Sequence, residues 1–143
     1  PNPCTRMISF PPCKINLGLD VIEKRSDGYH NLETVFYPIP LTDVLEVIPA
    51  ATTQFFPSGT LIPGEAKDNL CLRAYELVKK DFDLDPVAIH LHKVIPTGAG
   101  LGGGSSDAAH TLRLLNQVFE LSLHKHQLQY YAQQLGSDCA FFM

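Results

Sequence analysis

Alternating apolar and polar residues dominate the first half of the chain and predict β-strands. The alternation is clearest in residues 13–22, where every second residue is apolar: Ile15, Leu17, Leu19 and Val21. Residues 33–40 and 43–49 are further strand candidates, and Asp27-Gly28 predicts a turn before them. Residues 57–68 are rich in glycine and proline, so we expect a loop there.

A helical period appears next, over residues 68–82. Its apolar residues lie on one helical face: Leu70, Ala74, Leu77, Val78 and Phe82. Asp68 or Asn69 is the expected N-cap, since both side chains accept hydrogen bonds from a first helical turn. Residues 86–96 return to alternation and predict another strand.

The last third of the chain predicts two helices and a final strand. Apolar residues recur at helical spacing over residues 105–119, and a second helix is expected from Ser122 to a C-cap at Gly136. The apolar run of residues 137–143 is typical of a strand entering a core, and a chain that stops there resembles a truncated one. The order strands, helix, strand, helix, helix favours an α+β fold over a doubly wound sheet.

Size, composition and charge narrow the class of protein. The chain has 143 residues, 45% hydrophobic and 18% charged, which predicts one globular domain. No segment approaches the ~18 apolar residues that a membrane helix needs, and the start lacks the pattern of a secretory signal, so we expect a cytoplasmic protein without a membrane partner. A formal charge of -4 without a Lys/Arg cluster disfavours a nucleic-acid partner.

Cysteine and histidine spacing argues against a metal site. The four cysteines are widely scattered: Cys4, Cys13, Cys71 and Cys139. No C-x-x-C pair occurs, so we expect reduced, mostly buried thiols. The two histidine pairs lack Cys, Asp or Glu at ligand spacing, which predicts solvated side chains at His90, His92, His124 and His126.

A glycine-rich loop carries the strongest functional signal. Five of the ten glycines fall between Gly98 and Gly104, after a predicted strand and before a predicted helix. Glycine permits positive φ and lets a ligand reach main-chain N–H groups, and the first turn of a helix offers unpaired donors at its positive end. This arrangement predicts a phosphate cradle. The alternative is a flexible turn whose small residues allow close packing.

Three familiar phosphate-binding loops do not fit the residues and elements that surround these glycines. Gly98, Gly100 and Gly103 satisfy G-x-G-x-x-G, but no second parallel strand ending in an acidic residue follows at the required distance. A P-loop needs Lys-Ser or Lys-Thr after its last glycine, whereas Gly104 precedes Ser-Ser. A protein-kinase loop joins two strands, whereas this one runs into a helix.

The stretch "PTGAGLGGGSSDAA", residues 96–109, resembles the P-x-x-x-G-L-G-[SG]-S-[SG]-A motif of the GHMP kinase superfamily, which includes galactokinase, homoserine kinase and mevalonate kinase. Residues 12–21, 24–36 and 135–142 are similar, in this order, to the branch that acts in the non-mevalonate isoprenoid pathway. The resemblance implies that residues 1–143 form the N-terminal ATP-binding domain, a ribosomal-protein-domain-2-like β-α-β fold with a mixed sheet and helices on one face, without the C-terminal domain.

The resemblance also implies an activity. Relatives transfer the γ-phosphoryl group of ATP to the tertiary 2-hydroxyl of a methylerythritol linked to cytidine diphosphate. We expect Mg²⁺ to arrive with ATP, held largely by phosphate oxygens, and assign it no protein ligand. Residues expected to hold ATP form the loop and the helix start: Pro96, Thr97, Gly98, Ala99, Gly100, Leu101, Gly102, Gly103, Gly104, Ser105 and Ser106. Lys93 and residues 67–70 are expected to flank the adenine. Asp107 is expected to turn toward solvent or Mg²⁺, away from phosphate.

Two catalytic residues follow from the resemblance. Asp138 matches the aspartate that accepts the hydroxyl proton, and Lys14 matches the lysine that keeps it ionised and offsets charge. Without the resemblance, Asp138 is typical of a turn after Gly136 and Lys14 of a solvated strand face.

Four residues match substrate-binding positions. Asn16 shares a strand face with Lys14 and is expected near the reacting hydroxyl, while Tyr29 and His30 match the positions that recognise cytosine, and Phe36 is expected in the same pocket. From the residues alone, Tyr29 and His30 are equally typical of a turn with two half-exposed rings, and Phe36 of a core aromatic.

The match has two departures. Ala140 stands where many relatives carry proline, and the family's C-terminal half is absent, so we expect the 143-residue chain alone to be inactive or nearly so. Two alternatives remain. Another GHMP small-molecule kinase, of mevalonate or homoserine type, is opposed by "RSDGYH", residues 25–30. A non-enzymatic RNA-binding module of similar fold is opposed by the acidic balance and the intact glycine loop.

Overall fold

A four-stranded mixed sheet forms one layer of the molecule. The computed structural model describes residues 7–143, apart from the side chain of Leu32, so the predicted thiol of Cys4 lies outside the described residues. The sheet has the order β1-β4-β6-β5, with β1 (Met7–Ser9), β4 (Val44–Pro49), β5 (Gln54–Gly59) and β6 (Val87–Lys93). β4 is antiparallel to β1 and β6, whereas β5 is parallel to β6.

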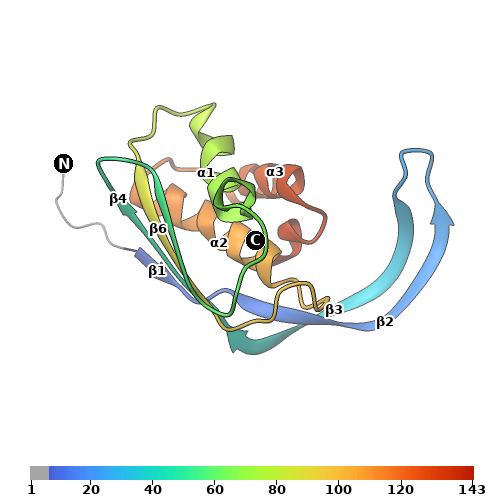
Figure 1. Cartoon of the computed structure of the whole chain (residues 1–143). Coiled ribbons are helices and arrows are strands. Elements are labelled where there is room, and N and C mark those ends of the chain that lie inside the picture. The colour runs from blue at the N-terminus through green and yellow to red at the C-terminus, as the bar shows by residue number, and fades with distance from the viewer. Residues whose placement is uncertain (1–6) are drawn as a thin grey trace.

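Three helices cover one face of this sheet (Figure 1). They are α1 (Leu70–Lys79), α2 (Gly103–Val118) and α3 (Lys125–Leu135). Alternate residues of β4 and β6 meet the apolar stripes of the helices, and the largest fully buried aliphatic side chains in this layer are Leu45, Val47, Val78, Val87, Ile89, Leu91, Leu112 and Leu115. The predicted α+β class, with a mixed sheet and helices on one face, is confirmed.

A long hairpin makes the second sheet and projects from the body (Figure 1). It pairs β2 (Pro12–Lys24) with β3 (His30–Thr42), and register shifts interrupt the ladder near Pro12, Leu17 and Val21. The alternation correctly predicted β2. Its outer apolar residues are not buried, however, because Leu17 is 51% and Val21 61% exposed.

Short elements at the ends of the chain depart from the predictions. The predicted strand over residues 137–143 is wrong: a 3₁₀-helix, η2 (Cys139–Phe142), lies there and buries Cys139 and Phe142 against α2 and α3. A short, largely apolar run fits a strand or a short buried helix equally well. α3 begins at Lys125 rather than near Ser122, because Gln127 Oε1 accepts a hydrogen bond at 2.9 Å from the N–H of His124, the N-cap. The short strands β1 and β5 were missed.

The predicted cap residues are found at the start of α1 and at the end of α3. Asn69 caps α1, since its Oδ1 accepts from the N–H of Cys71 at 2.9 Å. A 3₁₀-turn, η1 (Ala66–Asp68), precedes that cap, and Gly136 ends α3 as predicted. Among residues 7–143, no helix combines the length and apolar character needed to span a bilayer.

Candidate active site

The glycine loop connects β6 to α2 and takes a left-handed backbone at three of its glycines. Gly98, Gly100 and Gly102 have φ of +75°, +75° and +67°. Gly102 is also the N-cap of α2, and a Cβ there would lie 3.1 Å from Lys14 Cε. A Cβ on Gly103 would lie 2.8 Å from Ile95 Cγ2. Gly102 is therefore favoured by its left-handed backbone and by the nearby Lys14 side chain, whereas Gly103 is required by space alone.

The start of α2 presents main-chain donors. The first helical hydrogen bond runs from the N–H of Ser106 to the carbonyl of Gly102 at 2.9 Å, so the N–H groups of Gly103, Gly104 and Ser105 precede it. Gly102 has no side chain with which to cap them. Pro96 to Gly100 are exposed, and Gly104 is exposed as well. The predicted cradle is thus geometrically available to an anion at a positive helix end.

A pocket of about 260 Å³ opens beside this helix start. Thr97 and Gly104 line it from the loop side, and Phe55, Ile62 and Leu70 give it an apolar wall. Asp68 and Asn69 also line it, so three of the four residues expected to flank the adenine, 68–70, border this pocket. An apolar pocket next to a phosphate cradle has the shape that a nucleoside phosphate requires.

Lys14 reaches the mouth of α2 from the start of β2. Its N–H group donates to the carbonyl of Leu101 at 2.9 Å, which holds the strand against the glycine loop. Its Nζ donates to Asn16 Oδ1 at 2.7 Å and lies 4.4 Å from the centre of the Phe36 ring. Because only 4% of the side chain is exposed, the alternative of a solvated strand-face lysine is wrong.

Asp138 meets Lys14 from the other end of the chain. Its Oδ2 lies 3.5 Å from Lys14 Nζ, and its side chain is 34% exposed. Asp138 sits between the end of α3 and η2, where it precedes the first η2 residue. The ammonium is buried while the carboxylate remains accessible, so the pair can offer a proton acceptor to a molecule bound at the mouth of α2.

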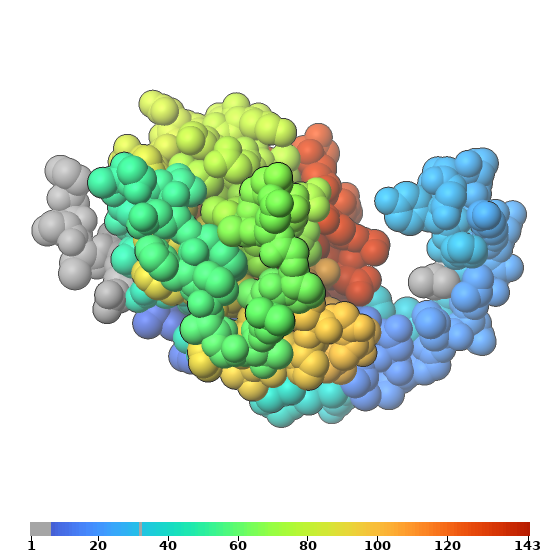
Figure 2. Space-filling model, viewed as in Figure 1, coloured from blue at the N-terminus to red at the C-terminus, as the bar shows by residue number. Residues whose placement is uncertain are grey.

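Asn16 and Phe36 join this cluster, whereas Tyr29 and His30 do not. Phe36 packs edge-to-face on Phe141 of η2, with ring centres 4.9 Å apart. Tyr29 and His30 lie at the exposed tip of the hairpin, and no hydrogen bond or ring contact among the described residues joins them to Lys14 or Asp138. Figure 2 shows the curled hairpin standing apart from the body across an open hollow.

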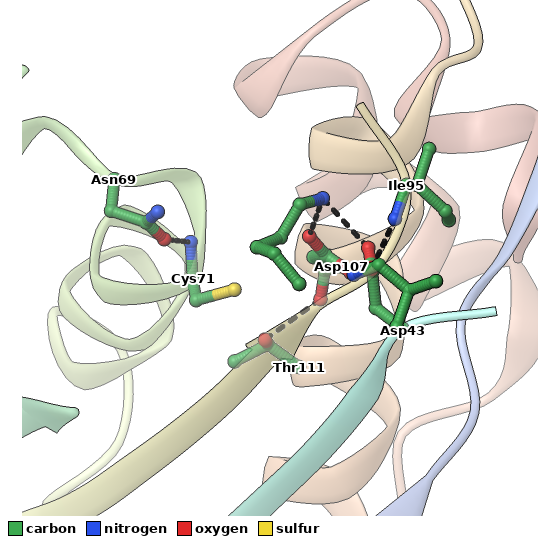
Figure 3. Close-up of polar contacts among 8 residues, drawn as sticks. Asp43, Asn69, Cys71, Ile95, Asp107 and Thr111 are labelled. Carbon is green, nitrogen blue, oxygen red and sulfur yellow. Dashed lines mark hydrogen bonds and ion pairs between the residues drawn. The ribbon is translucent and has the colours of Figure 1, made fainter. Parts of the chain in front are cut away.

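A second lysine lies beneath the glycine loop, in a place the sequence did not predict. Lys93 Nζ donates to Asp43 Oδ2 at 2.6 Å and to Asp107 Oδ2 at 2.9 Å. All three side chains are at most 3% exposed. The expectation that Lys93 flanks the adenine is therefore wrong for its side chain, and Asp107 is buried rather than turned toward solvent. Figure 3 shows Asp43 and Asp107 converging from different elements.

Burial shifts the ionisation of this buried cluster. It raises the pKa of Asp107 to about 7, because the loss of hydration and the nearby Asp43 outweigh the attraction of Lys93. For Lys93, burial alone would lower the pKa, but the two carboxylates raise it above its ordinary value. The ammonium therefore stays charged, while Asp107 titrates near neutral pH.

The other candidate groups are structural. Burial raises the pKa of the Cys71 and Cys139 thiols, so both stay protonated, and Cys13 is buried as predicted. His90 is not simply solvated, since its ring stacks on Phe56 and its Nδ1 lies 3.1 Å from Glu46 Oε2. Within residues 7–143, no three His, Cys, Asp or Glu side chains are grouped as a metal site would need.

Asp43 is the residue of this region that sequence reasoning missed. The alternation includes it in the strand predicted over residues 43–49, whereas it falls in the one-residue break between β3 and β4. A charged residue between two apolar strand segments was the available signal, because such a residue is rarely fully buried without a partner. Its partners, at residues 93–95, could not be read from spacing.

Comparison with known proteins places the chain in a family. The family model described as "GHMP kinases N terminal domain" matches residues 69–143. A 4-diphosphocytidyl-2-C-methyl-D-erythritol kinase of Cytophaga hutchinsonii is 61% identical over 137 residues, covering 96% of this chain and 51% of that protein. The chain spans about half the length of the curated relatives it matches.

Solved structures agree with this placement. The crystal structure of a 4-(cytidine 5'-diphospho)-2C-methyl-D-erythritol kinase is 40% identical, with a TM-score of 0.79 over 95% of this chain and 48% of that one. A homoserine kinase from Cytophaga hutchinsonii is only 14% identical, with a TM-score of 0.63 over 96% of this chain and 42% of that one, and so shares the fold alone. With its glycine loop, its mixed sheet and a family match over residues 69–143, the chain belongs to the GHMP kinases and carries their N-terminal domain.

Proposed function

We propose that this chain supplies the ATP-binding domain and the Lys14–Asp138 pair of a kinase that phosphorylates the 2-hydroxyl of 4-diphosphocytidyl-2-C-methyl-D-erythritol. The single observation that carries the proposal is the 3.5 Å contact between Lys14 Nζ and Asp138 Oδ2, made beside the uncapped start of α2. The substrate assignment is supported by the names of two relatives that are 61% and 57% identical, whereas the 14% identical homoserine kinase shares only the fold.

Each group has a chemical role in this reaction. Asp138 accepts the proton of the attacking hydroxyl, and Lys14 keeps that carboxylate anionic and offsets charge on the transferred phosphoryl group. Asn16 orients the Lys14 ammonium through its 2.7 Å hydrogen bond and stands close to the reacting hydroxyl. The N–H groups of Gly103, Gly104 and Ser105 bind phosphate oxygens of ATP, whose base occupies the pocket beside Leu70.

Two ligand groups complete the site. Mg²⁺, arriving with ATP, neutralises charge on the β- and γ-phosphates, and we assign it no ligand among the described residues. Tyr29 and His30 bind cytosine at the hairpin tip, where both are exposed, so the substrate spans from the tip toward Asp138. We place the protein in the cytoplasm.

A substrate comparison tests the proposal. The protein at its natural length is incubated with ATP and Mg²⁺ and, separately, with the cytidylyl compound, mevalonate or homoserine. We expect ADP formation with the first compound alone. Equal or greater turnover of mevalonate or homoserine would reject the substrate assignment, and no ATP-dependent turnover of any of them would reject the kinase. The 143-residue chain alone is expected to show little or no turnover in the same assay.

A further inference from the structure

Asp43 lies at the meeting point of the segments that form the candidate site. Its side chain is fully buried, at 0% exposed. Its Oδ1 accepts hydrogen bonds from the N–H groups of Val94 at 2.6 Å and Ile95 at 2.9 Å, which begin the glycine loop. Its own N–H donates to the carbonyl of Pro11 at 3.0 Å, directly before the strand that carries Lys14. Figure 3 shows the contact with Ile95.

The same carboxylate reaches the far end of the loop through Lys93. Asp43 Oδ2 accepts from Lys93 Nζ at 2.6 Å, and that ammonium also donates to Asp107 Oδ2 at 2.9 Å in the first turns of α2. The residues before the loop and the helix after it are thus joined beneath the loop. Gly103 closes on this connection, because a Cβ there would lie 3.1 Å from Lys93 Nζ.

Stability alone does not explain these buried charges. Two carboxylates share one ammonium, so the cluster keeps an uncompensated negative charge while both carboxylates are ionised. Buried ion pairs recover their lost hydration only in part, and apolar replacements of similar volume are often as stable. What the cluster provides that an apolar core does not is direction, because each hydrogen bond fixes one main-chain or side-chain atom of the loop ends.

We propose that Asp43 is a positioning residue, which fixes the two ends of the glycine loop relative to each other and to the Lys14 strand, and thereby sets the spacing of the donors that hold the phosphates of ATP. The proposal rests on the proposed function. Asp43 touches neither nucleotide nor substrate, so its effect must pass through Val94, Ile95 and Lys93. It follows that the phosphates, rather than the base, should feel its loss.

The test compares ATP with adenosine. In Asp43→Asn the amide oxygen can still accept from the loop, but the amide nitrogen then faces the Lys93 ammonium as a second donor. We expect the Kd for ATP, measured by NMR titration of the protein at its natural length, to rise about tenfold, the size of effect expected when a hydrogen bond to a charged group is weakened. The Kd for adenosine should stay within about twofold, because the base pocket keeps its lining residues.

Controls separate this proposal from the proposed function and from unfolding. Asp83→Asn makes the same chemical change at an exposed position and should leave both Kd values unchanged. Should Asp43→Asn not fold, Asp107→Asn loosens the same connection at its other end and should raise the ATP Kd by about threefold. Asp107 also lines the pocket beside the helix start, so this result supports the positioning role only if the adenosine Kd stays within about twofold. Unchanged Kd values, or an equal loss for both ligands, would overturn the positioning role. A wild-type protein that binds no ATP would instead overturn the proposed function.

Discussion

Two buried lysines lie on either side of the glycine loop, and they differ in what surrounds their partners. Gly102 contacts the side chain of Lys14, and the next residue, Gly103, approaches the Lys93 ammonium. Both lysines are 4% exposed. The carboxylate beside Lys14 is 34% exposed, however, whereas the two beside Lys93 are at most 2% exposed.

The distances follow the same division. Lys93 makes two charged hydrogen bonds of 2.6 and 2.9 Å, which is typical of a fixed structural contact. Lys14 stands 3.5 Å from Asp138 and makes its short hydrogen bond to the neutral Asn16 instead. Burial of a lysine is therefore no guide to its role. What differs is the accessibility of the partner carboxylate. Asp138 is accessible enough to exchange a proton with a bound ligand, whereas Asp43 and Asp107 are buried and hold the loop.

Lys93→Met tests the sealed cluster, by which we mean Asp43, Lys93 and Asp107. The substitution removes the cation that lies between Asp43 and Asp107 and leaves two buried carboxylates beside each other. We expect the free energy of unfolding at pH 8, measured by chemical denaturation, to fall by about 3–5 kcal/mol. Lys80→Met, at an exposed helix end, should change it by less than about 0.5 kcal/mol. A Lys93→Met protein as stable as the wild type would contradict the structural role of Lys93.

Asp138→Asn tests the open pair, by which we mean Lys14 and the accessible Asp138. Without a proton acceptor, kcat should fall by about 10²–10⁴ at saturating ATP. The melting temperature should barely change, because Asp138 is partly solvated and its partner Lys14 keeps the hydrogen bond to Asn16. A lower melting temperature with unchanged kcat would make Asp138 a structural residue. The Lys14–Asp138 pair would then have a structural role, as the sealed cluster has.

The sequence predicted those features of the site that depend on neighbouring residues. Five glycines between a strand and a helix predict a loop with positive φ and an exposed helix start, and the structure has both. Alternation placed Lys14 and Asn16 on one face, where their side chains indeed meet. These features depend on neighbouring residues, so their periods and spacings are sufficient.

What depends on tertiary contacts was not predictable from spacing. Lys14 and Asp138 come from opposite ends of the chain, and their pairing came from a family resemblance. Lys93 was misplaced because nothing within residues 86–96 shows that an aspartate fifty positions earlier, Asp43, turns its side chain inward to meet it. The exposed apolar face of β2 shows the same limit, because alternation predicts a strand but not what covers it.

A pH series tests the sealed cluster through the titration of Asp107. The pKa of Asp107 is raised from 3.8 to about 7, so the folded protein holds this proton more tightly than the unfolded chain does. Stability from Asp107 should therefore fall as pH rises from about 4 to about 7 and stay level above that. Relative to Asp107→Asn, which cannot titrate, the wild type should lose roughly 3 kcal/mol of unfolding free energy across this window.

That difference is measured by chemical denaturation of both proteins at matched pH values, so that contributions from other titrating groups cancel. Lys93 and Asp43 are the groups whose charges act on Asp107. A difference independent of pH would mean that Asp107 is ionised throughout, as it would be if the cluster admitted water. The carboxylates beside Lys93 would then be accessible to water, as the carboxylate beside Lys14 is.

Two alanine substitutions give the smallest and most local test. Gly100→Ala and Gly102→Ala both place a side chain at positive φ, which costs about 1 kcal/mol in each case. Only the Gly102 methyl group meets other atoms, 3.1 Å from Lys14 Cε and 3.3 Å from Phe142, because nothing lies within 4 Å of a Cβ at Gly100. At saturating ATP, kcat of Gly102→Ala should be about tenfold lower than that of Gly100→Ala, because the Lys14 ammonium is displaced from Asp138. Equal kcat values would show that the loop does not hold Lys14 in its working position, and the open pair would then depend on Asn16 alone.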